Sequence, residues 1–191
     1  MKFLEKDLEN IIYDAAQTNI GREKLRERGL DLHGVTFRQV DLGDYGIADL
    51  VNIHVERSET GTYWRFSIIE LKKGKIDINA VMQACRYKTA LREFVLKHFD
   101  ASDYSVSFNI VMIGDSIEKD NDFVFLYNFL RDVKIYTYDY KLSGLFFYEV
   151  SKSWIKTNGD IANNTKLLLT KPGFSLLREI LSDSLPAELP F

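Results

Sequence analysis

Residues 47–73 read IADLVNIHVERSETGTYWRFSIIELKK, and this stretch decides the fold of the chain. Ile47 to Arg57 and Tyr63 to Lys72 are rich in β-branched and aromatic residues, which favour strands. Ser58 to Thr62, between them, has the composition of a turn. The stretch therefore predicts an antiparallel β-hairpin.

The segments on either side of this hairpin predict helices and further strands. Apolar residues at helical spacing and helix-favouring composition predict helices over Phe3–Ala16, Arg22–Arg28, Ile78–His98, Asp122–Arg131 and Phe174–Leu181. Apolar and aromatic runs predict strands over Val35–Val40, Val106–Ile113, Val133–Tyr138 and Leu145–Val150. Asp77 stands where it can cap the long helix. This order predicts an α/β fold in which helices flank a mixed sheet.

The composition is that of a globular protein. The 191 residues are 46% apolar and 28% charged, and no apolar run is long enough to span a bilayer. The only cysteine, Cys85, cannot form an internal disulfide. These features favour a reducing, cytoplasmic setting.

The charge distribution matters more than the net charge. A formal charge of −3 weighs mildly against a nucleic-acid partner, although carboxylates that bind a metal lower this count. From Lys72 to Lys97 there are seven lysines and arginines against only Asp77 and Glu93. A basic stretch therefore follows directly on the second strand of the hairpin.

Three charged residues of the hairpin stand beside apolar runs. Strand alternation places Glu70 and Lys72 on one face, about 6.6 Å apart, and the hairpin brings the chain back alongside Asp49. Two carboxylates in apolar surroundings cost several kcal/mol unless partners compensate them, and a divalent cation removes their repulsion. Taken alone, Glu70 and Lys72 are also explained as a surface ion pair.

A further pair lies on the long helix that follows. Gln83 and Tyr87 are four residues apart and therefore share a helix face. Taken alone, the pair is explained by packing of Tyr87 and solvation of Gln83.

Together these motifs resemble the PD-(D/E)xK nuclease superfamily in its RecB-like form, with the NucS-type endonuclease domain as the nearest likeness. The likeness rests on Gly46–Leu50, Ile69–Gly74, Gln83-x-x-x-Tyr87 and the acidic helix around Leu4–Glu9. It implies a restriction-endonuclease-like αβββαβ core over residues 1–150, with 151–191 as an extension packed on the same domain. Ala48 stands where the family name has proline.

The resemblance implies Mg²⁺- or Mn²⁺-dependent hydrolysis of phosphodiester bonds in nucleic acid, with DNA as the expected substrate. Asp49, Glu70 and the main-chain carbonyl of Leu71 would hold the metal, whose oxygen ligands suit Mg²⁺. Lys72 would position or help to deprotonate the attacking water, and it would offset developing negative charge. Gln83 would orient Lys72 or contact a phosphate.

The acidic helix offers two candidates for the further carboxylate of such sites. Glu5 and Glu9 lie one turn apart, and the Glu-x-x-Leu-Glu pattern favours Glu5. Nucleic-acid contacts would come from the long helix. Tyr87 would hold this helix against the sheet and reach the substrate, whereas Arg86 and Lys88 are either phosphate contacts or solvated charges.

Other interpretations stay open at this point. The chain could be an inactive member of the fold that binds nucleic acid or protein, an interaction protein that docks through residues 151–191, or a hydrolase of small nucleotides. A homodimer is plausible because many such nucleases cut two strands.

Other chemistries have weaker signals. The histidines show no zinc-ligand spacing with Cys85, and there is no Gly-x-Ser-x-Gly or phosphate-binding Gly-x-x-x-x-Gly-Lys motif. Tyr136-x-Tyr138-x-Tyr140 could stack on bases, but such alternation more often marks a hairpin with one buried face.

Overall fold

The computed structural model describes residues 4–59, 61–98, 104–119 and 121–151. The helix expected over Phe174–Leu181 lies outside these ranges, as does nearly all of the extension expected over residues 151–191.

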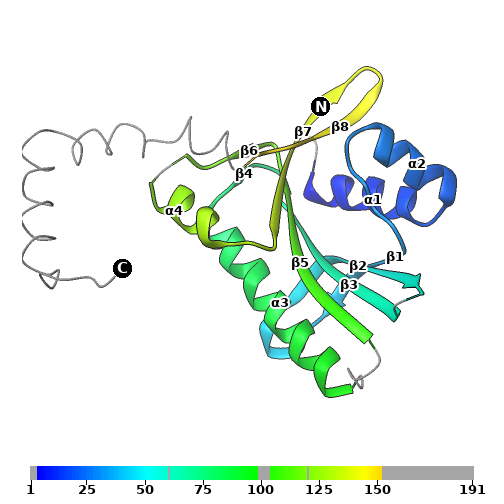
Figure 1. Cartoon of the computed structure of the whole chain (residues 1–191). Helices are drawn as coiled ribbons and strands as arrows, with labels where there is room; N and C mark the ends of the chain where they lie inside the picture. Colours follow the sequence, from blue (N-terminus) through cyan, green and yellow to red (C-terminus); the bar gives the residue numbers. More distant parts are fainter. Residues whose placement is uncertain (1–3, 60, 99–103, 120, 152–191) are drawn as a thin grey trace, which may run out of the picture.

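A mixed six-stranded sheet forms the centre of the molecule (Figure 1). Its order is β1-β2-β3-β5-β7-β8. The strands are β1 (Val35–Asp41), β2 (Ile47–Ser58), β3 (Gly61–Leu71), β5 (Tyr104–Gly114), β7 (Val133–Lys141) and β8 (Gly144–Glu149). β3, β5 and β7 are parallel to one another, whereas β1–β2, β2–β3 and β7–β8 are antiparallel pairs. The expected hairpin is confirmed as β2–β3.

Helices cover both faces of this sheet. They are α1 (Glu5–Ala16), α2 (Asn19–Glu27), α3 (Ile78–His98) and α4 (Asn121–Phe129). Figure 1 shows α1 and α2 on one side of the sheet and α3 on the other. Asp77 does cap α3, because its Oδ1 accepts a hydrogen bond from the Ala80 N–H at 2.8 Å. The α/β fold with a mixed, helix-flanked sheet is therefore confirmed.

The second helix begins earlier than the expected Arg22. The Thr18 hydroxyl accepts a hydrogen bond from the Gly21 N–H at 3.0 Å and so caps α2 at its first turn. The charged segment at Arg22–Arg28 is therefore the second half of a helix that packs against α1.

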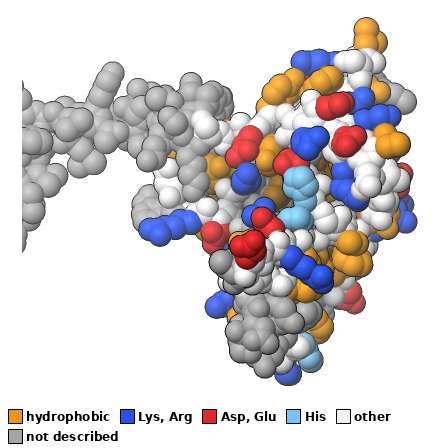
Figure 2. Space-filling view, turned by 45° about the vertical axis from the view of Figure 1, so that its right-hand side comes forward, with side chains coloured by type: hydrophobic (Ala, Val, Ile, Leu, Met, Phe, Trp, Pro, Cys, Tyr) orange, Lys and Arg blue, Asp and Glu red, His pale blue; other side chains and the backbone are white. Residues whose placement is uncertain are grey.

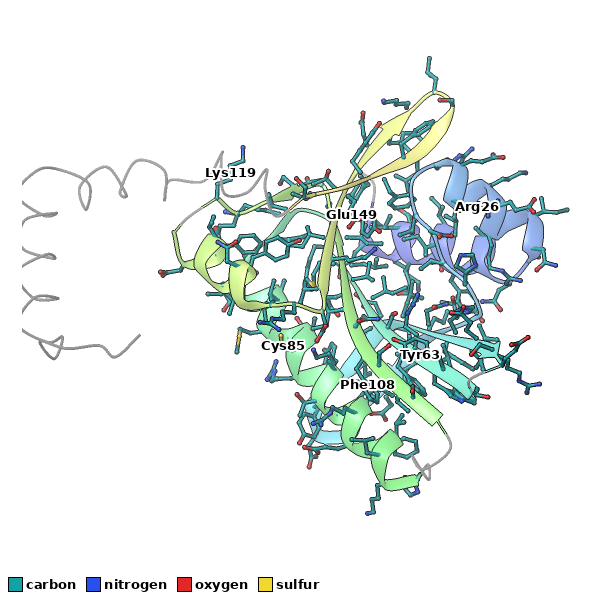
Figure 3. All side chains as sticks on the ribbon, in the orientation of Figure 1. Arg26, Tyr63, Cys85, Phe108, Lys119 and Glu149 are labelled. Atoms are coloured by element: carbon teal, nitrogen blue, oxygen red, sulfur yellow. The ribbon has the colours of Figure 1, made fainter. Side chains whose placement is uncertain are left out.

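Alternation along β3 produces the two layers of the core. Ile69 and Leu71 pack with Ile12 of α1, whereas Ile68 packs with Leu91 of α3. On the α3 side, the ring of Phe108, labelled in Figure 3, stacks on that of Phe66 with centroids 5.3 Å apart. Both sides of the strand are thus closed by apolar contacts near the end that carries Glu70.

Three short elements carry no sequence signal. β4 (Lys75–Ile76) pairs in parallel with β6 (Ser116–Ile117), and η1 (Gly43–Tyr45) is a single turn before β2. Two or three residues are too few for a periodic pattern. Among the described helices, none combines the length and the apolar character needed to cross a lipid bilayer.

Candidate active site

Asp49 lies where β2 and β3 stop pairing. The last paired residues are Leu50 and Ile69, and beyond them the Asp49 Oδ2 accepts a hydrogen bond from the Leu71 N–H at 2.9 Å. The Asp49 carboxylate thus accepts the hydrogen bond that a main-chain carbonyl of β2 would accept if the strand pairing continued. Burial raises the pKa of Asp49, and the Leu71 hydrogen bond offsets this only in part.

Glu70 is the most buried charged side chain of the site, with 1% of its surface exposed. Its Oε1 accepts a hydrogen bond from the Lys72 ammonium at 2.8 Å, but the buried Oε2 has no hydrogen-bond partner among the described residues. Burial and the nearby charge of Asp49 raise the pKa of Glu70 to about 7. The site therefore holds a carboxylate whose negative charge is incompletely compensated.

Lys72 is the cation of this group. It follows β3 directly, and its N–H donates to the carbonyl of Ile113 at 2.8 Å, which fixes its position beside β5. Burial lowers the pKa of Lys72, but the hydrogen bond to Glu70 and the surrounding carboxylates outweigh burial, so the pKa lies above its usual value. The ammonium is therefore charged at neutral pH.

Glu5 reaches the same strand end from α1. Its Oε2 accepts a hydrogen bond from the Lys73 N–H at 3.0 Å, whereas the Glu9 Oε2 accepts one from the Gln39 side chain at 2.8 Å. Of the two acidic residues on this helix, Glu5 thus contacts the segment that carries Glu70 and Lys72.

A hollow of about 530 Å³ lies beside Asp49. Glu5, Lys6, Glu9 and Asn10 of α1 line one side, and Arg38 and Gln39 of β1 line the other. Gln39 has a φ of 50°, which is uncommon for a residue other than glycine and marks local strain. A substrate group could approach Asp49 through this hollow, where Lys6 and Arg38 supply positive charge.

Gln83 and Tyr87 lie on one face of α3, as their spacing predicts. The Gln83 side chain donates to the Tyr87 hydroxyl at 2.7 Å, and Tyr87 is only 4% exposed. In this conformation Tyr87 packs the helix against the start of β2 near Gly46. Arg86 is exposed, and the Lys88 ammonium lies 3.7 Å from a carboxylate oxygen of Asp132.

The contact between Tyr87 and Gly46 yields a prediction on stability. Gly46→Ala is expected to destabilise the protein by roughly 1–3 kcal/mol. Gly46 has a φ of 110°, and an added Cβ would lie 3.1 Å from a ring carbon and 3.1 Å from the hydroxyl oxygen of Tyr87. Gly74→Ala is the control, because its φ is not positive and its Cβ would meet nothing within 4 Å. Equal denaturation midpoints for the two variants would contradict the prediction.

The donor atoms of the site fit a hard divalent cation. Among the described residues no group of three or more His, Cys, Asp or Glu side chains is arranged to hold a metal. Asp49 and Glu70 instead supply two carboxylates, and the orphaned Oε2 of Glu70 is a buried acceptor that a cation would satisfy. Oxygen donors completed by main-chain carbonyls and water are the ligands that Mg²⁺ prefers.

The structure brings to the candidate site three residues that the sequence does not identify. The Tyr138 hydroxyl donates to the carbonyl of Lys73 at 2.8 Å and so holds the segment after β3 from β7. Arg38 and Gln39 reach the hollow from β1. No local motif marks these three residues, since only the folded sheet brings Arg38 and Gln39 to Asp49 and Tyr138 to Lys73. In the sequence, Tyr138 is visible only as part of an aromatic alternation.

Comparisons of the chain with protein-family models, with curated proteins and with solved structures give no match.

Proposed function

We propose that this protein is a metal-dependent nuclease with a restriction-endonuclease-like core, acting on DNA. One observation carries the proposal. Asp49, Glu70 and Lys72 meet at the end of β3, and Glu70 is buried with one oxygen unsatisfied beside a second carboxylate. Such an arrangement costs stability in the absence of a ligand, and strained, perturbed groups concentrate at functional sites.

Asp49, Glu70 and the carbonyl of Leu71 would hold Mg²⁺ or Mn²⁺. A divalent ion supplies charge stabilisation at phosphate oxygens and lowers the pKa of water. The hydrogen bond from the Leu71 N–H orients the Asp49 carboxylate. Asp49 is therefore a positioned ligand candidate rather than a mobile surface acid.

Lys72 acts as a hydrogen-bond donor and a positive charge. Its pKa lies above the usual value, so the ammonium keeps its proton and does not serve as the base in this state. In hydrolysis, water attacks phosphorus, the bond to the leaving oxygen breaks, and a proton ends on that oxygen. The Lys72 ammonium would offset the negative charge that develops on the phosphate during this displacement.

The hollow beside Asp49 is the proposed approach for the substrate backbone. Arg38 and Lys6 lie at its walls beside Glu5 and Glu9, and these two cations are the groups of the hollow that would contact a phosphate. Glu5 closes the hollow on the side of Lys73 and would hold a water through its free carboxylate oxygen.

Cleavage assays test this proposal directly. Labelled single-stranded, double-stranded and branched DNA and RNA are incubated with the full chain in Mg²⁺, Mn²⁺ or EDTA. We expect cleavage of DNA in Mg²⁺ or Mn²⁺ and none in EDTA. If no substrate is cut with either metal but nucleic acid or a protein partner binds, the inactive nuclease-fold alternative replaces the proposal.

A further inference from the structure

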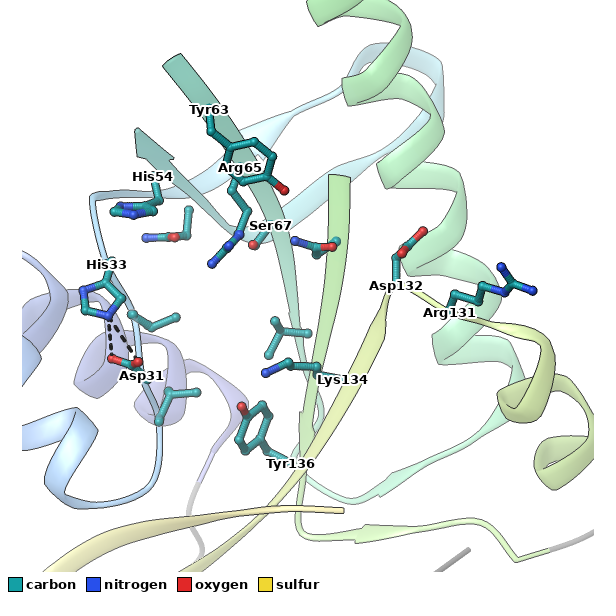
Figure 4. A pocket seen from close by; sticks show the side chains of 15 residues that line it. Asp31, His33, His54, Tyr63, Arg65, Ser67, Arg131, Asp132, Lys134 and Tyr136 are labelled. Atoms are coloured by element: carbon teal, nitrogen blue, oxygen red, sulfur yellow. Dashed lines mark hydrogen bonds and ion pairs between the residues drawn. The ribbon is translucent and has the colours of Figure 1, made fainter. Parts of the chain in front are cut away.

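A second hollow, of about 420 Å³, opens on the same sheet face as α1 and α2, over the part of that face that these helices do not cover (Figure 4). Its floor consists of alternate residues from β2, β3, β5 and β7, and the segment 30–33 after α2 forms one wall. It shares no lining residue with the hollow beside Asp49. Arg65 and Glu70 are five residues apart along β3, which separates the two places by roughly 16 Å.

The strand register makes the floor unusually polar for central strands. Three side chains lie side by side across β2, β3 and β5, namely Asn52, Ser67 and Asn109. The neighbouring row on the same face is apolar and consists of Leu50, Ile69 and Val111. Ser67 is only 7% exposed, yet neither it nor Asn109 has a side-chain hydrogen-bond partner within the described ranges. Ser67 is buried and Asn109 is half-buried, and both line the hollow, so their polar atoms have capacity to bind a ligand there.

The charges around the hollow leave a cation unpaired. Arg65 forms no ion pair with any described carboxylate, and its guanidinium lies 5.6 Å from the centre of the Tyr63 ring. Of the two acidic residues of the lining, Asp31 bonds to His33 in the same wall at 3.1 Å, and Asp132 lies 3.7 Å from Lys88, which does not line the hollow. Arg65 is therefore a cation of the lining that an anion could pair with.

The cationic groups converge on the middle of the hollow. Figure 4 shows the Arg65 guanidinium and the Lys134 ammonium pointing into it from opposite sides, whereas Arg131 points away. The Lys134 ammonium is 3.7 Å from Glu149, a long and exposed contact that a stronger anion could replace. Donors on two sides and hydroxyl and amide groups below suit the several oxygens of a phosphate.

Flat rings form another part of the wall. His33 and His54 lie with ring centroids 5.4 Å apart, and Tyr63 stands next to Arg65. Figure 2 shows histidines on the molecular surface among acidic and basic side chains. Aromatic faces of this kind stack on nucleobases or similar rings.

We propose that this hollow binds a small phosphate ester that carries a flat aromatic ring, such as a nucleoside monophosphate. Arg65, Lys134, Ser67 and Asn109 would bind the phosphate, and Tyr63 with the two histidines would contact the ring. The volume lies within the range of small-molecule sites. The inference is independent of the proposed nuclease function, because it uses other residues.

Isothermal titration of the full chain with AMP tests the inference. Ribose 5-phosphate, adenosine and inorganic phosphate separate the contributions of ring and phosphate, and a single-stranded oligonucleotide tests for a polymer. We expect AMP to bind more tightly than each of the three fragments. Arg65→Gln is expected to weaken AMP binding by on the order of tenfold or more, the value of one hydrogen bond to a charged group.

Arg57→Gln is the matched control, since Arg57 is an exposed residue of the same hairpin that does not line the hollow. Ser67→Ala tests the floor with a minimal change, and thermal melting verifies that each variant is folded. The inference fails if AMP does not bind, if Arg65→Gln and Arg57→Gln bind AMP equally, or if only the oligonucleotide binds. Equal binding of AMP and ribose 5-phosphate would refute the role assigned to the aromatic wall.

Discussion

Asp49→Asn is expected to slow DNA hydrolysis by on the order of a thousandfold while the protein stays folded. Asparagine retains an oxygen that can accept the hydrogen bond from the Leu71 N–H, so the end of the β2–β3 pairing keeps its geometry. The substitution removes only the negative charge. The loss of rate would therefore report on the charge of Asp49 and not on its structural bond.

Two measurements separate the effect of the Asp49 charge from the effect of its hydrogen bond with Leu71. Initial rates are compared at saturating Mg²⁺, and melting temperatures are compared in EDTA. Because the charge of Asp49 raises the pKa of Glu70 through repulsion, the metal-free variant should melt no lower than the wild type. An active Asp49→Asn, or one that loses activity only because it unfolds, would contradict the assignment.

Lys72 and Lys73 provide an internal comparison for the same assay. Lys72→Met removes the ammonium that contacts Glu70 at 2.8 Å and should reduce the rate by a similar order of magnitude. Lys73 is exposed, and its main chain makes the contacts with Glu5 and Tyr138, so Lys73→Met keeps them. Equal losses in both variants would contradict the role proposed for Lys72.

The parts of the fold that could be predicted from the sequence are those with long periodic patterns. The 21 residues of α3 match the expected range of Ile78–His98 at both ends, because apolar spacing and the Asp77 cap agree. The β2–β3 hairpin likewise combines alternation with a turn. The start of α2 was misplaced because the capping hydroxyl of Thr18 is a single residue in a segment of little apolar character.

The candidate site was predictable only where its residues are close in sequence. Glu70 and Lys72 lie at the same strand end, and the hairpin brings Asp49 to them. The spacing of these three residues in the sequence therefore predicts that they lie together. The contact of Tyr138 with Lys73 joins residues 65 positions apart and depends on β7 lying beside β5. The polar row of the second hollow depends on the register of three strands, which no local pattern specifies.

Glu70 gives the last prediction, which concerns stability and pH in the absence of metal. Its carboxyl has a pKa of about 7 in the folded protein and 4.5 when exposed. Between these values the folded state holds a proton that the unfolded state has released. Since stability falls with rising pH wherever the folded state binds more protons, the free energy of unfolding should decrease from pH 4.5 to 7. The difference of 2.5 pKa units corresponds to about 3 kcal/mol.

Other groups of the site do not reverse this trend. The pKa of Asp49 is also raised by burial, so its contribution has the same sign at lower pH. The pKa of Lys72 is raised, so its stabilising contribution is lost only above the usual lysine range. Urea denaturation in EDTA at several pH values from 5 to 8 measures the slope. Glu70→Gln should flatten it, because glutamine cannot titrate.

A bound divalent cation should also remove the loss of stability that accompanies ionisation of Glu70. If Asp49 and Glu70 hold Mg²⁺ or Mn²⁺, the bound ion favours the ionised carboxylates, and stability near pH 7 should rise with metal concentration. The rise should be absent in Glu70→Gln and should grow between pH 6 and 8 in the wild type. A metal-free slope that Glu70→Gln abolishes, combined with no response to either metal, would mean that the raised pKa of Glu70 is a structural feature and that the site does not bind these ions.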